Sequence, residues 1–145
     1  MIRRIEIADA EAVASIARAA RFGAIPGLPD LHTLAEDRDF YRSQIESKSG
    51  CVWVDDEGSI VGFVIWLGAF IDHLYVDPKD QRSGVGTRLL DAAVAEMGVP
   101  EVCLWTFQAN ERAVAFYSTH GFRVREATDG SATEERLPDY LLVRP

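Results

Sequence analysis

The stretch from Ile71 to Met97 constrains this 145-residue chain more than any other part of it. Its first six residues are apolar, β-branched or aromatic, which predicts a strand, and Pro78 ends that strand because proline cannot donate to a central ladder. From Gly84 onward, apolar residues recur at the i, i+3, i+4, i+7 spacing of an amphipathic helix. The glycine-rich turn between strand and helix would leave the first N–H groups of the helix open to a ligand, and the helix dipole adds positive charge there. The stretch therefore predicts a site for a phosphate-bearing ligand.

Two common phosphate loops do not fit this turn. The dinucleotide fingerprint requires a third glycine at the position of Leu89. A P-loop requires lysine and then serine or threonine after its last glycine, whereas Thr87 and Arg88 follow Gly86 here. What remains is the pattern Gln81-x-x-Gly84-x-Gly86, which resembles the pyrophosphate loop of the GNAT superfamily of acyl-CoA-dependent N-acetyltransferases.

Composition and charge narrow the class of protein. The length predicts a single domain over residues 1–145, large enough to bury a core without disulfides. The net charge of −8 argues against a nucleic-acid partner, while Lys79, Arg82 and Arg88 gather positive charge around the glycine loop. No run is long enough to span a membrane and no signal peptide is evident, so we expect a cytoplasmic protein without a membrane partner. Cys51 and Cys103 have no metal-ligand spacing, and we expect reduced core thiols.

The rest of the chain predicts an α/β (α+β) fold. Strands are expected at Arg3–Ile7, Cys51–Asp55, Ile60–Leu67, Phe70–Val76, Val102–Phe107, Phe122–Ala127 and Tyr140–Val143, and helices from about Asp9 to Ala20, Thr33 to Ile45, Gly84 to Met97 and Glu111 to His120. Asp9 is expected to cap the first helix, and Phe40, Tyr41 and Ile45 to form the buried side of the second. The result is a mixed, mostly antiparallel sheet of about seven strands with four helices, in the order β-α-α-β-β-β-α-β-α-β-β.

A second motif strengthens the GNAT resemblance. The chain reads Asn110-x-x-Ala113-x-x-Phe116-Tyr117-x-x-x-Gly121-Phe122, a pattern that GNAT members often carry at this distance after the glycine loop. The expected order of elements is also that of the GNAT fold, so the resemblance covers essentially the whole chain from Arg3. It implies acetyl-CoA as acyl donor and transfer of its acetyl group to a primary amine. His32, His73 and His120 lack metal-ligand spacing, so no metal is expected. Dimerisation is frequent in the superfamily, which makes a homodimer an expectation from the resemblance.

The resemblance also implies a binding site. In this fold the strand ending at Val76 and the strand from Val102 splay apart, so that free strand edges can pair with the peptide-like pantetheine arm. The implied acyl-CoA-binding residues are Leu74, Tyr75 and Val76 on the strand, Gln81, Arg82, Ser83, Gly84, Val85, Gly86 and Thr87 in the loop, and Asn110, Ala113, Phe116 and Tyr117 at the following helix.

Three residues are candidates for catalysis. Tyr117 is expected to protonate the departing thiolate, as the tyrosine of the Phe-Tyr pair commonly does in the family. For the base, the candidates are Asp72 and His73, which strand alternation would place on opposite faces, Asp72 with Leu74 and His73 with Ile71. The polar segment Thr128–Asp139 predicts a binding loop or lid. Its Glu134 and Glu135 are candidates for holding a cationic acceptor.

The sequence leaves the acceptor open between a small-molecule amine and a protein amine, because a fold does not fix a substrate. The N–H of Val76 is the candidate donor to the thioester oxyanion. Two other functions also remain open at this stage. One is a non-catalytic acyl-CoA-binding sensor or regulatory module, which would keep the glycine loop without needing a base. The other is a nucleotide-binding regulatory domain.

Overall fold

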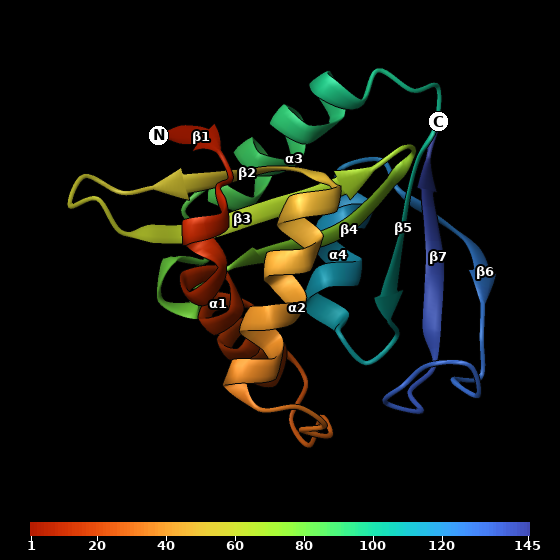
Figure 1. Cartoon of the computed structure of the whole chain (residues 1–145). Coiled ribbons are helices and arrows are strands. Elements are labelled where there is room, and N and C mark those ends of the chain that lie inside the picture. The colour runs from red at the N-terminus through yellow and green to blue at the C-terminus, as the bar shows by residue number, and fades with distance from the viewer.

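Seven strands form one mixed sheet in the order β1-β2-β3-β4-β5-β7-β6 (Figure 1). The computed structural model describes all residues from Met1 to Pro145. The strands are β1 (Ile2–Arg4), β2 (Ser49–Val54), β3 (Ile60–Leu67), β4 (Phe70–Val76), β5 (Val102–Phe107), β6 (Arg123–Ala127) and β7 (Asp139–Arg144). The helices are α1 (Ala10–Ala24), α2 (Leu34–Ser47), α3 (Val85–Met97) and α4 (Glu111–Thr119), and short 3-10 turns cover Ile7–Asp9 and Pro78–Asp80. The predicted fold class and element order are confirmed.

Two apolar cores cover the two faces of the sheet. Helices α1 and α2 lie on one face of β2–β4 and α3 lies on the other (Figure 1). The second core also includes Leu104 of β5, Leu142 of β7 and Tyr117 of α4. Phe63 and Ile65 of β3 enter the first core, whereas Val64 and Trp66 enter the second, as expected for a strand covered on both faces. Gly62 lets α3 approach closely, since a Cβ there would lie 3.1 Å from the Leu89 side chain.

Strands β4 and β5 form the only parallel pair, and they meet at one end alone. Their register holds a single pair, Phe70 with Cys103, next to a bond from the Cys103 N–H to the Ala69 carbonyl at 2.8 Å. All other neighbouring strands run antiparallel. The carboxyl ends of β4 and β5 therefore do not pair with each other, and the sheet opens between them.

A β-bulge changes which β4 side chains share a face. The β3–β4 register shifts between Ile65 and Trp66, so that Trp66 pairs with Ile71 and Ile65 pairs with His73. Asp72 is the extra residue, and Ile71 therefore lies in the α3–α4 core, against which Leu74 also packs. The expected strict alternation, with Ile71 on the face of His73, is wrong for this reason.

The largest differences from the predicted elements lie near the N-terminus. The first strand is Ile2–Arg4, and Ile7 is 47% exposed in the 3-10 turn that follows. Asp9 precedes α1 without capping it, because its carboxylate accepts from the Glu6 N–H and pairs with Arg3 at 2.9 Å. In α2, Phe40 is exposed although Tyr41 and Ile45 are buried. No helix combines the length and apolar character needed to cross a membrane.

Candidate active site

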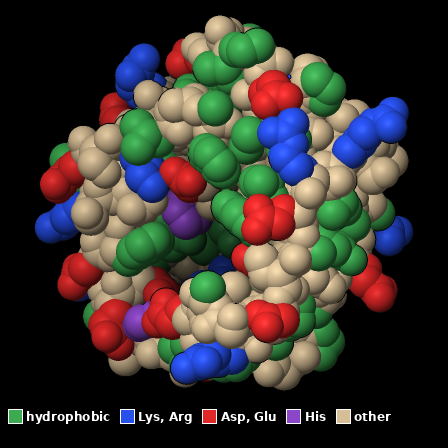
Figure 2. All heavy atoms as spheres, turned by 90° about the vertical axis from the view of Figure 1, so that its right-hand side faces the viewer, with side chains coloured by type: hydrophobic (Ala, Val, Ile, Leu, Met, Phe, Trp, Pro, Cys, Tyr) green, Lys and Arg blue, Asp and Glu red, His purple; other side chains and the backbone are tan.

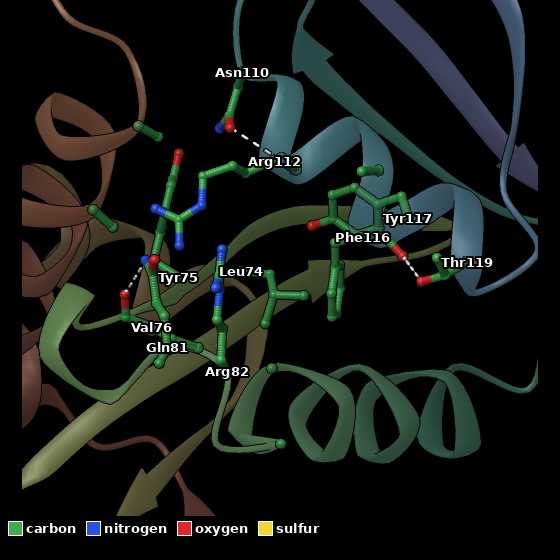
Figure 3. Close-up of a pocket in the computed structure, with 16 residues that line it drawn as sticks. Leu74, Tyr75, Val76, Gln81, Arg82, Asn110, Arg112, Phe116, Tyr117 and Thr119 are labelled. Carbon is green, nitrogen blue, oxygen red and sulfur yellow. Dashed lines mark hydrogen bonds between the residues drawn. The ribbon is translucent and has the colours of Figure 1, made fainter.

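The opening between β4 and β5 leads into a cavity of about 480 Å³. Its walls come from β4, the loop before α3, one face of α4 and small residues near the end of α1, Ala20 and Ala24 (Figure 3). The glycine loop therefore lies beside the Asn110–Phe122 motif in space, although more than twenty residues separate them in the sequence.

The start of α3 has the geometry of an anion site. Gly84 is the N-cap residue and has a φ of +86°, a left-handed conformation that side chains rarely adopt. No side chain caps this helix, so its first N–H groups are available to a ligand. A Cβ at Gly86 would lie 3.5 Å from the Phe116 ring, which is an ordinary van der Waals contact. The loop thus presents backbone donors to the cavity.

Strand β4 offers further backbone groups. Alternate residues of β4 bond to β3, and the Asp77 N–H bonds to the Val61 carbonyl at 2.8 Å. The main-chain groups of Leu74 and Val76 therefore point to the other side, where β5 has moved away. The Gln81 side chain donates to the Val76 carbonyl at 3.1 Å and so ties the loop to the strand end. A peptide-like chain entering the cavity would find an open strand edge there.

Two arginines converge on the cavity from opposite sides. Figure 3 shows the Arg82 side chain rising from the loop before α3 and the Arg112 side chain reaching over from α4. Neither forms an ion pair or a side-chain hydrogen bond, so both charges are available to an anionic ligand. Arg88, expected near the loop, instead lies over the Trp53 ring at 5.2 Å. Asn110 caps α4 by accepting from the Ala113 N–H. The sequence analysis missed Arg112, although its place two residues after Asn110, within the motif, was a usable signal.

Most residues expected to bind acyl-CoA line this cavity: Leu74, Tyr75, Val76, Gln81, Arg82, Gly84, Gly86, Asn110, Ala113, Phe116 and Tyr117. Three residues of the loop point elsewhere. The Ser83 hydroxyl donates to the Asp80 carbonyl, Val85 is buried in the core, and the Thr87 hydroxyl lies 3.1 Å from Nε2 of His120. The binding roles of all these residues stay predictions. Ser83 and Thr87 can still contribute backbone N–H groups.

A second, smaller pocket of about 150 Å³ adjoins the cavity at the carboxyl ends of β4 and β5. The two spaces share Leu74, Tyr75, Asn110, Ala113 and Tyr117 in their walls. The face drawn in Figure 2 is hollowed, and acidic side chains and a histidine stand at the edge of the hollow. The site therefore has room for one ligand on each side of the β4–β5 opening.

Tyr117 lies where these two spaces meet. Its ring is buried against Phe116 and Phe122, and its hydroxyl points into the larger cavity (Figure 3). The hydroxyl has no hydrogen-bond partner within the protein. Removal from water, and secondarily the neighbouring Tyr75 phenol, raises the pKa of Tyr117 well above its usual value. The hydroxyl is therefore protonated at neutral pH and can donate a proton to a ligand.

The two candidates for the base both line the smaller pocket, with different surroundings. Asp72 is partly exposed and pairs with Lys48 at 2.8 Å. His73 packs against α2, where Nε2 lies 3.1 Å from the Gln44 side-chain oxygen and Nδ1 lies 3.5 Å from the Tyr41 hydroxyl. Removal from water lowers the pKa of His73 to about 4, so that its imidazole is neutral at pH 7.

The segment between β6 and β7 packs on the last turns of α1 and on the loop that joins α1 and α2. Glu135 pairs with Arg21 at 3.3 Å, and Glu134 bonds to the His32 ring. This contact places the segment beside the smaller pocket, whose wall includes Arg21, Ile25 and Asp139. The two glutamates expected to hold a cationic acceptor already have partners within the protein. Their role in acceptor binding stays a prediction.

A sheet opened between two parallel strands, with an uncapped helix start on one side and a second pocket beside it, is the arrangement expected of an acyl-CoA-dependent acyltransferase. Residues 48–124 match the family model described as acetyltransferase (GNAT) domain. The chain belongs to this family of N-acetyltransferases, which transfer an acetyl group to an amine in an acyl-CoA-dependent reaction. This result favours the enzyme over the non-catalytic acyl-CoA module and the nucleotide-binding domain.

Relatives of known name support the assignment. The chain is similar to the peptidyl-lysine N-acetyltransferase YiaC of Escherichia coli, with 30% identity over 109 residues that cover 74% of this chain and 69% of that protein. It is 34% identical to the peptidyl-lysine N-acetyltransferase YjaB of Escherichia coli over 89 residues, 61% of this chain and 59% of that protein. The solution structure of apo YjaB superposes with a TM-score of 0.78 at 27% identity, covering 99% of this chain and 95% of that one. The fold also matches the PaiA N-acetyltransferase of Thermoplasma acidophilum in complex with coenzyme A, with a TM-score of 0.80 at 22% identity over 99% of this chain and 97% of that one.

Proposed function

We propose that this protein transfers the acetyl group of acetyl-CoA to the side-chain amine of lysine residues in other proteins. The observation that carries the proposal is the meeting of two spaces at Tyr117, one suited to the donor and one to an acceptor. Both relatives named above are peptidyl-lysine N-acetyltransferases, which supports a protein amine over a small one. A cytoplasmic location, a homodimer and the lack of a metal requirement stay predictions.

The donor would lie along β4 with its phosphates at the start of α3. The residues present fit such a ligand, because the N–H groups at Gly84 and Gly86 and the free guanidinium groups of Arg82 and Arg112 face one cavity. The open edge at Leu74 and Val76 would bind the pantetheine amides. The N–H of Val76 is the proposed donor to the oxyanion that forms on the thioester carbonyl.

Proton transfers complete the reaction. The acceptor enters as an ammonium ion and must lose a proton before its nitrogen can attack the thioester carbonyl. We retain Asp72 over His73 as the proposed acceptor of that proton, directly or through water. Both His73 nitrogens face protein partners, whereas Asp72 pairs with Lys48 through Oδ2 alone and its Oδ1 has no hydrogen-bond partner. When the carbon–sulfur bond breaks, the thiolate takes a proton from the Tyr117 hydroxyl. The tyrosinate then recovers a proton from the solvent-connected site.

The proposal is tested by measuring thiol release from acetyl-CoA against a panel of acceptors. The panel holds lysine-containing peptides, the same peptides with Nε-acetyl-lysine, and small amines such as polyamines. We expect turnover with free lysine peptides and none with the blocked peptides, with mass spectrometry showing one added acetyl group per lysine. Turnover restricted to small amines would contradict the protein acceptor, and no turnover with any amine would contradict the enzyme activity proposed for the chain.

The two converging arginines give a separate test of donor binding. Replacing Arg82 or Arg112 with alanine should raise the KM for acetyl-CoA about fivefold, since one phosphate contact in a solvated cavity contributes about 1 kcal/mol. The effect should shrink at high salt because exposed charges are screened. Arg88→Ala is the matched control, because Arg88 lies over Trp53 and outside the cavity. If all three variants have the same KM for acetyl-CoA, then neither Arg82 nor Arg112 contributes to donor binding.

A further inference from the structure

The charged groups of the smaller pocket are nearly all neutralised by partners within the protein. Asp72 pairs with Lys48 at 2.8 Å, and Arg21 pairs with Glu135 at 3.3 Å. His73 is uncharged at neutral pH because its surroundings disfavour the imidazolium. The remaining charged group in the wall is Asp139, which forms no ion pair.

Asp139 is held in a defined position at the start of β7. It pairs across the sheet with Phe107, the last residue of β5, and so lies at the carboxyl end of the strand that borders the opening. The Gln108 side chain donates to its backbone carbonyl at 3.1 Å, and the Thr128 hydroxyl donates to Oδ1 of its carboxylate. Its Oδ2 has no hydrogen-bond partner. One carboxylate oxygen is thus fixed, and the other is available to a ligand.

We infer that Asp139, in the wall of the smaller pocket, is a specificity-determining residue that binds the ammonium group of the acceptor. The inference rests on the proposed function, and it identifies the residue by which the smaller pocket would select a charged amine. A partly buried carboxylate without a cation attracts a primary ammonium ion and gains a charge-assisted hydrogen bond from it. Trp105, which lines the same pocket and is 45% exposed, offers an aromatic surface to the aliphatic chain that carries the amine.

The test compares Asp139→Asn with Asp129→Asn. The first change removes the charge but keeps an oxygen that can accept from Thr128. The second removes one negative charge from an exposed residue of the same segment that lies outside both pockets. With a lysine peptide, Asp139→Asn should raise the KM at least tenfold, leave kcat within about twofold and leave the KM for acetyl-CoA unchanged. Asp129→Asn should leave all three constants near those of the wild type.

Hydroxylamine is an acceptor that is uncharged at neutral pH. It shows whether Asp139→Asn weakens recognition of the acceptor's charge or impairs the enzyme in general. The turnover of hydroxylamine should be the same in the wild type and in Asp139→Asn. Asp139→Glu, which restores the charge, should recover part of the lost affinity for the lysine peptide. An unchanged KM for the peptide in Asp139→Asn, or an equal loss with hydroxylamine, would overturn the inference. Wild-type enzyme that acetylates no amine would instead overturn the proposed function.

Discussion

Replacing Tyr117 with phenylalanine is expected to lower kcat about 100-fold while changing the KM for acetyl-CoA little. The reason is the position of its hydroxyl, which points into the larger cavity, where the proposed thiolate would form. Without a proton donor the thiolate must leave as an anion, and a positioned acid typically contributes a factor of 100 or more. The loss corresponds to about 3 kcal/mol of transition-state stabilisation.

The fold should survive this change. The ring contacts with Phe116 and Phe122 do not involve the hydroxyl, and that hydroxyl has no hydrogen bond whose loss would leave a partner unsatisfied. Tyr140→Phe is the matched control, because Tyr140 packs against the same core but lines neither pocket. The test compares kcat, the KM for acetyl-CoA and the melting temperature of the two variants with those of the wild type. If the kcat of Tyr117→Phe equals that of the control, the proposed role of Tyr117 as the acid is wrong.

The pH profile gives independent information on the same residue. Burial raises the pKa of the Tyr117 phenol, so the proposed proton donor stays protonated at every pH at which the protein is normally assayed. The wild-type rate should therefore show no alkaline decline from this group below about pH 10, the usual pKa of tyrosine. A decline near neutral pH that disappears in Tyr117→Phe would indicate that the phenol ionises much more easily than its surroundings imply.

The local parts of the site could be predicted from the sequence. The strand, turn and helix between Ile71 and Met97 follow from residue pattern, proline and glycine, and the structure has the strand and helix within a residue of their predicted bounds. The Asn110 cap was also predictable, and its side chain accepts from the Ala113 N–H at 3.1 Å. In both cases neighbouring residues in the sequence determine the geometry.

Features that depend on long-range pairing could not be predicted in this way. The place of Asp139 beside Phe107 depends on β7 lying between β5 and β6, an order that no local pattern encodes. The bulge at Asp72 depends on how β3 pairs with β4, and a one-residue shift moves side chains to the other face. The engagement of Arg88 with Trp53 likewise joins two distant segments. A charged residue that is close to a motif in the sequence is therefore weaker evidence for ligand binding than one that is close to the motif in the folded structure.

The contribution of His73 to the free energy of unfolding is expected to fall by about 3 kcal/mol as the pH is lowered from about 6.5 to 4. In the folded protein the pKa of His73 is about 4, against 6.5 for an ordinary histidine, so the unfolded chain binds its proton first. Stability rises with pH wherever the unfolded state binds more protons, and the loss on acidification therefore falls within this window. Below pH 4 both states carry the proton and this contribution is gone.

The groups that face His73 explain the direction of the shift. Its ring packs edge-on against Tyr41 and Phe40 of α2, and their burial of the imidazole is the largest cause. The neighbouring Asp72 carboxylate opposes the shift, whereas the Lys48 and Arg21 cations add to it. Several carboxylates with lowered pKa values, among them Asp9, lose their stabilising contribution only at about pH 4 and below, which separates their effect from that of His73.

Urea unfolding at a series of pH values between 7 and 4 measures this effect. His73→Gln should remove most of the acid-dependent loss above pH 4, because glutamine stays neutral and can still bond to Gln44. His32→Gln is the control, since His32 is exposed in the α1–α2 loop, and it should keep the loss seen in the wild type. Parallel stability curves for the wild type and His73→Gln would show that His73 titrates in the folded protein as it does in water. A difference confined to the window between pH 6.5 and 4 would show that His73, which lines the smaller pocket, causes the acid sensitivity of the fold.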